Sequence, residues 1–267
     1  MKLDGCSAII TGASAGIGRE LARQLAGRAK LLLLVARRRD RLEQLRSELL
    51  RVNRALQVEI REVDLSNLEQ TMQLAGWLAN KPVDFLVNNA GLGDYGSFAT
   101  AHPIRVNEQI QVNGLALTAL TRAVLPRMIA QKRGAILNVS SSAGFLPLPD
   151  LAVYAATKAY VTSFSEAIRA ETRGLGITVT ALCPGPVHTE FAQVADREQQ
   201  RGKVRTSPAH ISVEEVACVG LSAIGRDKAL VIPGIAMKIV MTIVRGLPLA
   251  VLRAAWRFSG TDKIDAR

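Results

Sequence analysis

Short runs of aliphatic and β-branched residues alternate along this chain with longer segments of helical periodicity. Such short runs, bounded by turn residues, are typical of buried strands. Between them, apolar residues recur at helical spacing, for example at 40–53 and in a longer segment at 105–131 that is predicted to form one helix. The predicted strands are SAIIT (7–11), KLLLLVA (30–36), LQVEIREV (56–63), VDFLVNN (83–89), GAILNVS (134–140), GITVTALC (176–183) and ALVIP (229–233).

This alternation predicts an α/β fold with a doubly wound parallel sheet of about seven strands and helices on both faces. A chain of 267 residues with 48% hydrophobic content is long enough to bury one sizeable core, so a single domain is expected. Ligands of such sheets bind at the carboxyl ends of the strands. The residues that follow each predicted strand are therefore the candidates for chemistry.

The first predicted strand leads into the glycine-rich loop TGASAGIG at 11–18 and then into a helix. Glycines at this place let the backbone approach a pyrophosphate at a helix N-terminus. A plain tight turn would use the same glycines, but the position inside a first βαβ unit favours phosphate binding. The candidate cofactor-binding residues of this loop are Gly12, Ser14, Gly16, Ile17 and Gly18.

The second predicted strand ends in three arginines, where an acidic residue would otherwise bind the ribose diol of an adenosine. A guanidinium binds a 2′-phosphate well, so Arg37, with help from Arg38, predicts NADP(H) rather than NAD(H) as the cofactor. The alternative is that both arginines only solvate the start of a helix. Asp64 and Leu65, at the end of the third strand, are candidates to contact the adenine.

The fourth and fifth predicted strands end in NNAG (88–91) and SSSAG (140–144), and the stretch DLAVYAATKAYV (150–161) follows. Small residues and amides at the first place either tie strand ends together or contact the cofactor, which makes Asn89, Ala90 and Gly91 candidates. In the last stretch, Tyr154 and Lys158 stand four residues apart and share one face of a predicted helix.

Taken together, these motifs resemble the short-chain dehydrogenase/reductase family over about residues 3–235. The matching motifs are TGASAGIG, NNAG, Asn113 in QVNG, SSSAG, the Y-x-x-x-K of Tyr154 and Lys158, and PGPVHT at 184–189. The resemblance implies a Rossmann-type catalytic domain at 1–235. An amphipathic C-terminal extension at 236–267 would then pack on the substrate side, on an oligomer interface or on a membrane surface.

The resemblance also implies a role for each catalytic residue. Tyr154 would be the general acid in ketone reduction and the general base in alcohol oxidation, with Lys158 and the positive nicotinamide of an oxidised cofactor together bringing its pKa from about 10 toward about 7. Lys158 would also hydrogen-bond the nicotinamide ribose, Ser141 would orient the substrate oxygen, and Asn113 would hold a water that connects Lys158 to solvent. The residues implied to seat the nicotinamide are Pro184, Gly185, Val187 and Thr189.

The expected function is therefore NADP(H)-dependent interconversion of a carbonyl compound and a secondary alcohol by hydride transfer, possible substrates including lipophilic or acyl compounds. The alternative is a non-catalytic NADP(H)-binding scaffold. Substrate specificity is expected from the loop at 92–103 and from the segment at 190–212, which carries four basic residues and forms either a lid or a solvated loop. Members of the family commonly form homodimers or homotetramers, and the same is expected here.

Charge and cysteine content exclude some other classes. A formal charge of +11 first suggests nucleic acid, but only 4% of the residues are aromatic and no basic tract is interleaved with stacking rings. No nucleic-acid partner is predicted, while a membrane surface or an anionic ligand stays open. Three distant cysteines indicate neither disulfides nor a metal site, and the N-terminus lacks the pattern of a secretory leader, so a cytoplasmic protein is expected.

The segment at 232–260 is apolar but carries Lys238, Arg245, Arg253 and Arg257, too many charges for a transmembrane span. Gly246 and Pro248 are predicted to split it into two short helices. Their apolar sides must be covered by the substrate pocket, by a partner subunit or by a membrane interface, where Trp256 and Phe258 would fit. Packing against another subunit of an oligomer is the simplest of these alternatives. Peripheral contact with a membrane is the other alternative in which the covering surface lies outside the chain.

Overall fold

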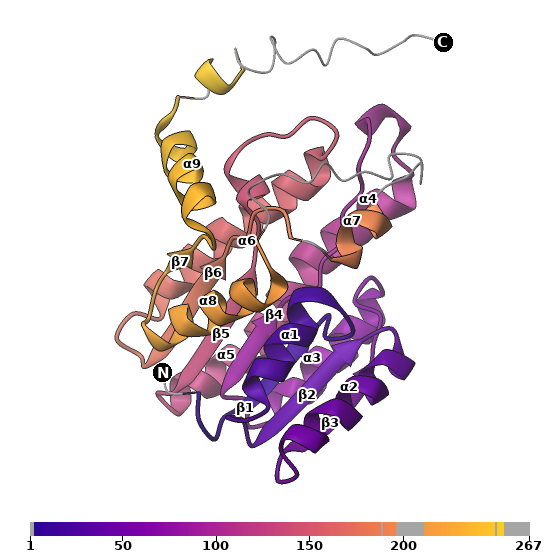
Figure 1. Cartoon of the computed structure of the whole chain (residues 1–267), viewed down its shortest axis with the longest axis vertical. Helices are drawn as coiled ribbons and strands as arrows, with labels where there is room; N and C mark the ends of the chain where they lie inside the picture. The colour runs from indigo at the N-terminus through magenta and orange to yellow at the C-terminus, as the bar shows by residue number, and fades with distance from the viewer. Residues whose placement is uncertain (1–2, 188, 196–210, 249, 254–267) are drawn as a thin grey trace.

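The computed structural model describes residues 3–187, 189–195, 211–248 and 250–253 of the chain. As the sequence pattern predicts, seven parallel strands form one sheet, and their order is β3-β2-β1-β4-β5-β6-β7 (Figure 1). The order reverses beside β1, so β1 and β4 flank the point where doubly wound sheets bind their ligands. The strands are β1 Ser7–Thr11, β2 Leu31–Ala36, β3 Gln57–Glu62, β4 Phe85–Asn88, β5 Gly134–Val139, β6 Ile177–Leu182 and β7 Leu230–Val231.

Helices cover both faces of the sheet, and each face has its own core cluster. One face is packed by α1 Gly16–Leu25, α2 Arg39–Val52 and α8 Val213–Gly225, and the other by α3 Leu68–Ala79, α5 Leu117–Ala130 and α6 Ala152–Glu171. Further elements lie beyond the carboxyl ends of the strands (Figure 1). These are η1 Phe98–Thr100, α4 Pro103–Ile110, η3 Ser142–Phe145, α7 Glu190–Ala195 and α9 Ile235–Gly246.

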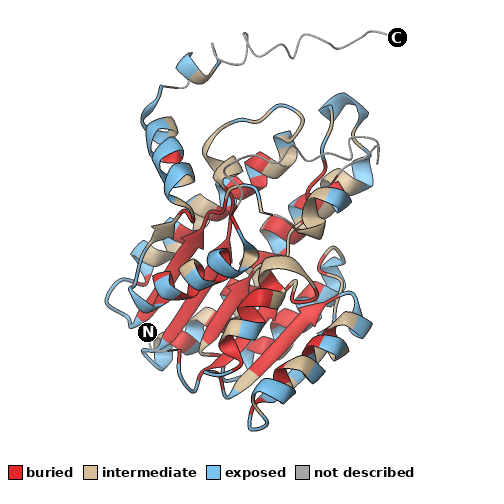
Figure 2. Cartoon of the chain, in the orientation of Figure 1, coloured by how far each residue is buried: buried red, intermediate tan, exposed pale blue. Residues whose placement is uncertain are grey.

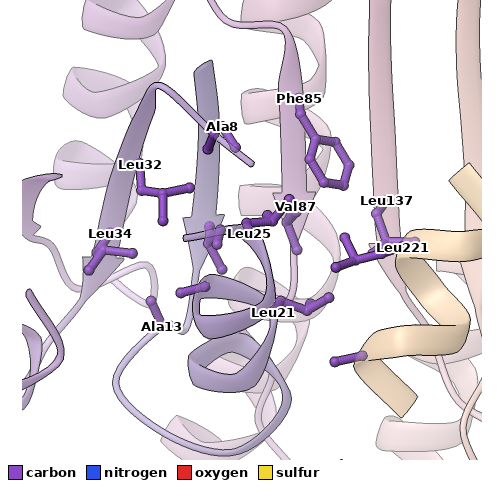
Figure 3. Packing of buried hydrophobic residues seen from close by; sticks show 14 of the residues in the cluster. Ala8, Ala13, Leu21, Leu25, Leu32, Leu34, Phe85, Val87, Leu137 and Leu221 are labelled. Atoms are coloured by element: carbon purple, nitrogen blue, oxygen red, sulfur yellow. The ribbon is translucent and has the colours of Figure 1, made fainter. Parts of the chain in front are cut away.

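The central strands are buried on both faces, which explains why their sequences are continuous apolar runs rather than alternating ones. Every residue of β1, β4, β5 and β6 is buried (Figure 2). Leu32 and Leu34 of β2 and Val87 of β4 pack against Leu21 and Leu25 of α1 in one cluster (Figure 3). This packing fixes the loop between β1 and α1, where the candidate cofactor motif lies.

The segment at 105–131 differs from the single helix expected. A π-helical turn, η2 (Gln111–Ala116), separates α4 from α5. The side chain of Asn113 in this turn bonds the backbone of Leu92 and the hydroxyl of Thr157, so tertiary contacts replace the regular α-helical pattern there. Turns of this kind are frequent at functional sites.

Beyond β7, α9 ends at Gly246 as predicted, and residues 250–253 form a further helical turn. None of the helices in the described ranges is long and apolar enough to cross a bilayer. Predictions for the following residues concern positions outside the described ranges: Trp256, Arg257 and Phe258 of the extension, and Arg197, Arg201, Lys203 and Arg205 of the expected lid.

Candidate active site

A cleft of about 690 Å³ lies at the carboxyl ends of the strands, between the β1–α1 loop on one side and α6, α7 and α9 on the other. It brings together segments from nearly the whole length of the chain. All of the predicted catalytic and cofactor-binding residues line this cleft except Gly18 and Asn113, which lie directly behind it. The fold therefore brings the predicted residues together in one place, and their catalytic and cofactor-binding roles stay predictions.

Gly12 and Gly18 permit the close packing that shapes the phosphate side of the cleft. Gly12 has φ +66°, and a Cβ there would lie 2.8 Å from Asn89 Nδ2; a Cβ on Gly18 would lie 2.4 Å from the same nitrogen. Asn89 Nδ2 in turn donates to the carbonyl of Thr11 at 2.9 Å. The Asn89 side chain thus ties β4 to the glycine loop, which is one of the two roles expected for it.

The first turn of α1 is open to a ligand. Ala15 at its N-cap supplies no capping side chain, and Gly16 has φ +53°. Uncapped backbone N–H groups at a helix N-terminus attract phosphate through hydrogen bonding and the helix dipole. The loop and helix therefore fit the pyrophosphate of a dinucleotide.

Tyr154, Lys158 and Ser141 meet on the opposite wall, where α6 passes the end of β5. Lys158 Nζ donates to the carbonyl oxygen of Val139 at 2.8 Å and lies 5.7 Å from the centre of the Tyr154 ring. Ser141 hydrogen-bonds the Tyr154 hydroxyl and accepts a bond from Ala143 N at 3.1 Å. Ser140, one residue earlier, donates instead to the Lys158 carbonyl at 2.8 Å. Ser141 is thus the serine that faces the tyrosine, as the resemblance implies.

The pKa of Tyr154 departs from the expected direction. Burial raises it to about 12, and the hydrogen bond with Ser141 acts in the opposite direction. Burial also lowers the pKa of Lys158 to about 8, and the residue as a whole is only 4% exposed. The groups of this chain alone therefore raise the pKa of Tyr154, and its expected lowering by Lys158 together with the positive nicotinamide of an oxidised cofactor stays a prediction.

Asn113 stabilises the wall behind the lysine. Its Oδ1 accepts from Leu92 N at 2.8 Å, and its Nδ2 donates to Leu92 O at 2.9 Å and to Thr157 Oγ1 at 3.0 Å. Thr157 Oγ1 donates to the Tyr154 carbonyl at 2.8 Å. The amide thus holds the strand-end loop against α6 beside both reactive side chains, and its expected part in a water relay stays a prediction.

The arginines at the far end of the cleft are not equivalent. Arg38 donates to Glu190 Oε2 at 2.9 Å and to Ser14 Oγ at 3.3 Å. Arg41 bonds the other oxygen of Glu190, and the hydrogen bonds from Arg41 and Arg38 lower the pKa of this carboxyl group. Arg37 is exposed, lines the cleft and makes no ion pair with any part of the chain that the structure describes. Arg37 is therefore the cation that is available to an anionic ligand.

Comparison with known proteins agrees with this geometry. The family described as short chain dehydrogenase matches residues 7–200 of the sequence. The chain belongs to this family. Over 193 residues it is 34% identical to the very-long-chain 3-oxoacyl-CoA reductase of Bos taurus, which covers 70% of this chain and 61% of that protein. The chain thus spans less than two thirds of the length of this relative.

Two solved structures can be aligned with almost the whole length of this short-chain dehydrogenase. The short-chain dehydrogenase from Sphingobium yanoikuyae, in complex with NADPH, has a TM-score of 0.81 and 29% identity over 98% of each chain. The bulky-bulky ketone specific alcohol dehydrogenase from Comamonas testosteroni has a TM-score of 0.78 and 27% identity, covering 98% of this chain and 97% of that one.

Several residues of this short-chain dehydrogenase that shape the cleft were not singled out from its sequence. Phe191 of α7 packs on Tyr154 with ring centres 5.3 Å apart, and a Cβ on Gly93 would lie 2.6 Å from its ring. Met237 and Met241 of α9 line the cleft from the C-terminal extension. The extension thus contributes two side chains to the cleft, and what covers the rest of its apolar surface stays a prediction.

Other predicted residues fall where their motifs imply. Pro184, Gly185, Val187, Thr189 and Leu65 all line the cleft; Gly185 lies against Met237 of α9, and Thr189 lies beside Gly16 of α1. The side chain of Asp64 accepts from the backbone N and the hydroxyl of Ser66 at 3.0 and 2.7 Å, so it stabilises its own turn. His188 lies outside the described residues.

Proposed function

We propose that this protein is an NADP(H)-dependent oxidoreductase that interconverts a lipophilic carbonyl compound and the corresponding secondary alcohol. The observation that carries the proposal is the meeting of Ser141, Tyr154 and Lys158 in one cleft with the open N-terminus of α1. The NADPH complex of the Sphingobium relative and the names of the reductase relatives support it.

Each reactive side chain has a definite task in carbonyl reduction. The nicotinamide cofactor would supply the hydride. The Tyr154 hydroxyl would donate its proton to the carbonyl oxygen while Ser141 hydrogen-bonds the same oxygen, and the ammonium of Lys158 would bond the cofactor ribose. Because burial raises the pKa of Tyr154, the phenol stays protonated at neutral pH, which is the form that reduction requires.

The walls of the cleft favour an apolar substrate. Many of the other lining residues are aliphatic, aromatic or thioether, and a substrate group with few polar atoms would lose little hydration beside them. The names of the relatives, an acyl-CoA reductase and a dehydrogenase of bulky ketones, support the same class. The residues concerned are Leu92, Val112, Leu146, Leu148, Leu151, Phe191, Val194, Met237 and Met241.

One experiment tests the proposal directly. NADPH and NADH binding would be measured by calorimetry, followed by cofactor oxidation with a panel of ketones, aldehydes and 3-oxoacyl thioesters. Turnover with at least one bulky apolar carbonyl compound is expected. Tight NADPH binding without turnover of any of these would favour the alternative, a non-catalytic NADP(H)-binding scaffold. Homodimer or homotetramer formation and a cytoplasmic location stay predictions.

The substitution Arg37→Asp is expected to weaken NADPH binding by about tenfold, the effect of one charge-assisted hydrogen bond, while NADH binding is kept or improved. The reason is that Arg37 is the available cation at the adenosine end, and a carboxylate there repels a 2′-phosphate but accepts a bond from a ribose diol. Dissociation constants for both cofactors check this. Equal binding of the two by the unaltered protein would contradict the cofactor assignment.

The substitution Glu190→Gln is expected to tighten NADPH binding about threefold without a matching change for NADH. A neutral amide leaves Arg38 and Arg41 without their carboxylate partner, so both gain attraction for a phosphate; exposed ion pairs of this kind have small energies. Glu171→Gln, at the far end of α6, is the control for the change in net charge. Equal gains for both cofactors would show that Glu190 does not compete with the 2′-phosphate.

A further inference from the structure

The outer side of α9 exposes aliphatic side chains. Ile235, Ile239 and Ile243 succeed one another every four residues and are 81, 57 and 59% exposed, and Val240 beside them is 48% exposed. Residues at this spacing lie on one side of a helix. They form the outer row, which Leu247 and Val251 continue beyond the end of the helix at 37 and 47% exposure.

Only a narrow stripe of α9 contacts the rest of the protein. Met237, Met241 and Val244 pack on a small cluster with Phe145 and Cys183, and most of the remaining surface of the helix is exposed (Figure 2). The helix stands above the carboxyl ends of β6 and β7, away from the large core clusters (Figure 1). An uncovered aliphatic row of this length on a soluble domain indicates an interaction surface.

The charges around this row identify the kind of partner. From Lys228 to Thr261 the sequence contains five basic residues and no acidic one. Lys238 and Arg245, both exposed and seven residues apart, share one flank of α9. Two copies of α9 facing each other would bring these like charges together, whereas an anionic surface with an apolar interior would complement both the cations and the outer row.

We propose that the outer row of α9 docks this protein on the surface of an anionic lipid bilayer. The helix lies on the membrane without spanning it, with Ile235, Ile239 and Ile243 directed into the lipid and Lys238 near the head groups. Cations close to such a surface and buried aliphatic area each strengthen the attachment. The net charge of +11 adds long-range attraction.

The inner stripe of the same helix connects the membrane surface to the reactive cleft. Met237 and Met241 line the cleft, and a Cβ on Gly185 would lie 2.7 Å from the terminal methyl of Met237. A membrane-bound protein would therefore present its cleft next to the lipid, where a lipophilic carbonyl compound concentrates. This second step rests on the proposed function, whereas the docking itself does not.

The test uses the full chain and lipid vesicles. Cosedimentation with phosphatidylcholine vesicles containing 30% phosphatidylglycerol, about the composition of an anionic bilayer surface, is expected to capture the protein, and pure phosphatidylcholine vesicles to capture much less. Raising the salt concentration should weaken capture because screening reduces the attraction of exposed charges. Ile239→Glu should weaken binding at least about tenfold, since it places a carboxylate in the lipid-facing row.

A matched control separates docking from a general effect of charge. Ile104→Glu introduces the same change at an equally exposed isoleucine, 61%, on α4, and should leave vesicle binding close to that of the unaltered protein. Equal losses in both variants, or failure of the unaltered protein to bind anionic vesicles, would overturn the proposal. So would a result in which Ile239→Glu dissociates an oligomer and leaves vesicle binding unchanged, because the row would then cover a second copy.

The proposed membrane docking and the proposed function can be refuted separately. Vesicle binding needs no turnover, so binding by a protein that reduces no carbonyl compound would refute the function and keep the docking. Conversely, the Ile239→Glu variant should catalyse reduction of a short water-soluble ketone at the same rate as the unaltered protein. Its reduction rate should be lower only when the ketone is supplied in vesicles. Equal rates with the vesicle-borne ketone would refute delivery from the membrane.

Discussion

Replacing Tyr154 by phenylalanine is expected to lower kcat for carbonyl reduction by about a thousandfold, the range that a positioned general acid contributes. The substitution removes only the hydroxyl group that bonds Ser141, and it keeps the ring that packs on Phe191. Removal of this hydroxyl group without loss of ring packing should leave the fold and the cofactor site intact. NADPH binding is therefore expected within about threefold of the unaltered protein, since no charged contact is lost.

Tyr160→Phe is the matched control for this substitution. Tyr160 lies on the same helix, but its hydroxyl group is exposed and bonds Thr118 Oγ1 at 2.7 Å, and its ring stacks on Phe164. Its loss should not change kcat. Steady-state kinetics and calorimetry on both variants decide the matter, and substantial residual turnover in Tyr154→Phe would contradict the assignment of the tyrosine as proton donor.

The sheet could be predicted from the sequence because its strands are short, apolar and separated by long helical segments. All seven predicted strands are present, and β1 begins and ends at the predicted residues. The order of the strands was not predicted from the sequence, because the rules for parallel connections limit the possible orders without selecting one. Local sequence patterns were sufficient to predict the central strands, because strands that are buried on both faces consist mainly of apolar residues.

The features that the sequence did not predict depend on contacts between distant segments. The interruption of the helix at 111–116 results from bonds that Asn113 makes to Leu92 and Thr157, and periodicity carries no sign of them. The pairing of Arg38 with Glu190 joins residues 152 positions apart. The direction of the Tyr154 pKa shift depends on how deeply the cleft buries the ring, which the Y-x-x-x-K spacing does not encode.

Replacing Lys158 by methionine is expected to abolish turnover and, at the same time, to stabilise the folded protein at neutral pH. Its pKa is about 8 in the folded chain against an ordinary 10.5, so folding with a protonated Lys158 costs about 3 kcal/mol by the linkage between pKa and stability. Methionine removes this cost and loses the hydrogen bond to the Val139 carbonyl, worth about 1 kcal/mol. A net gain of about 2 kcal/mol in the free energy of unfolding at pH 7 is expected from these two effects.

The pH dependence distinguishes this cause from better packing. Between pH 8 and 10.5 the folded protein binds fewer protons at Lys158 than the unfolded chain does. The free energy of unfolding of the unaltered protein therefore rises with pH relative to that of the variant. The advantage of Lys158→Met should therefore be constant below pH 8 and should shrink across this window. Lys30→Met, at an exposed lysine, should show no such trend. Denaturant unfolding at a series of pH values measures the difference, and an advantage that persists unchanged at pH 10.5 would show that the ammonium of Lys158 is not the buried charge that opposes folding.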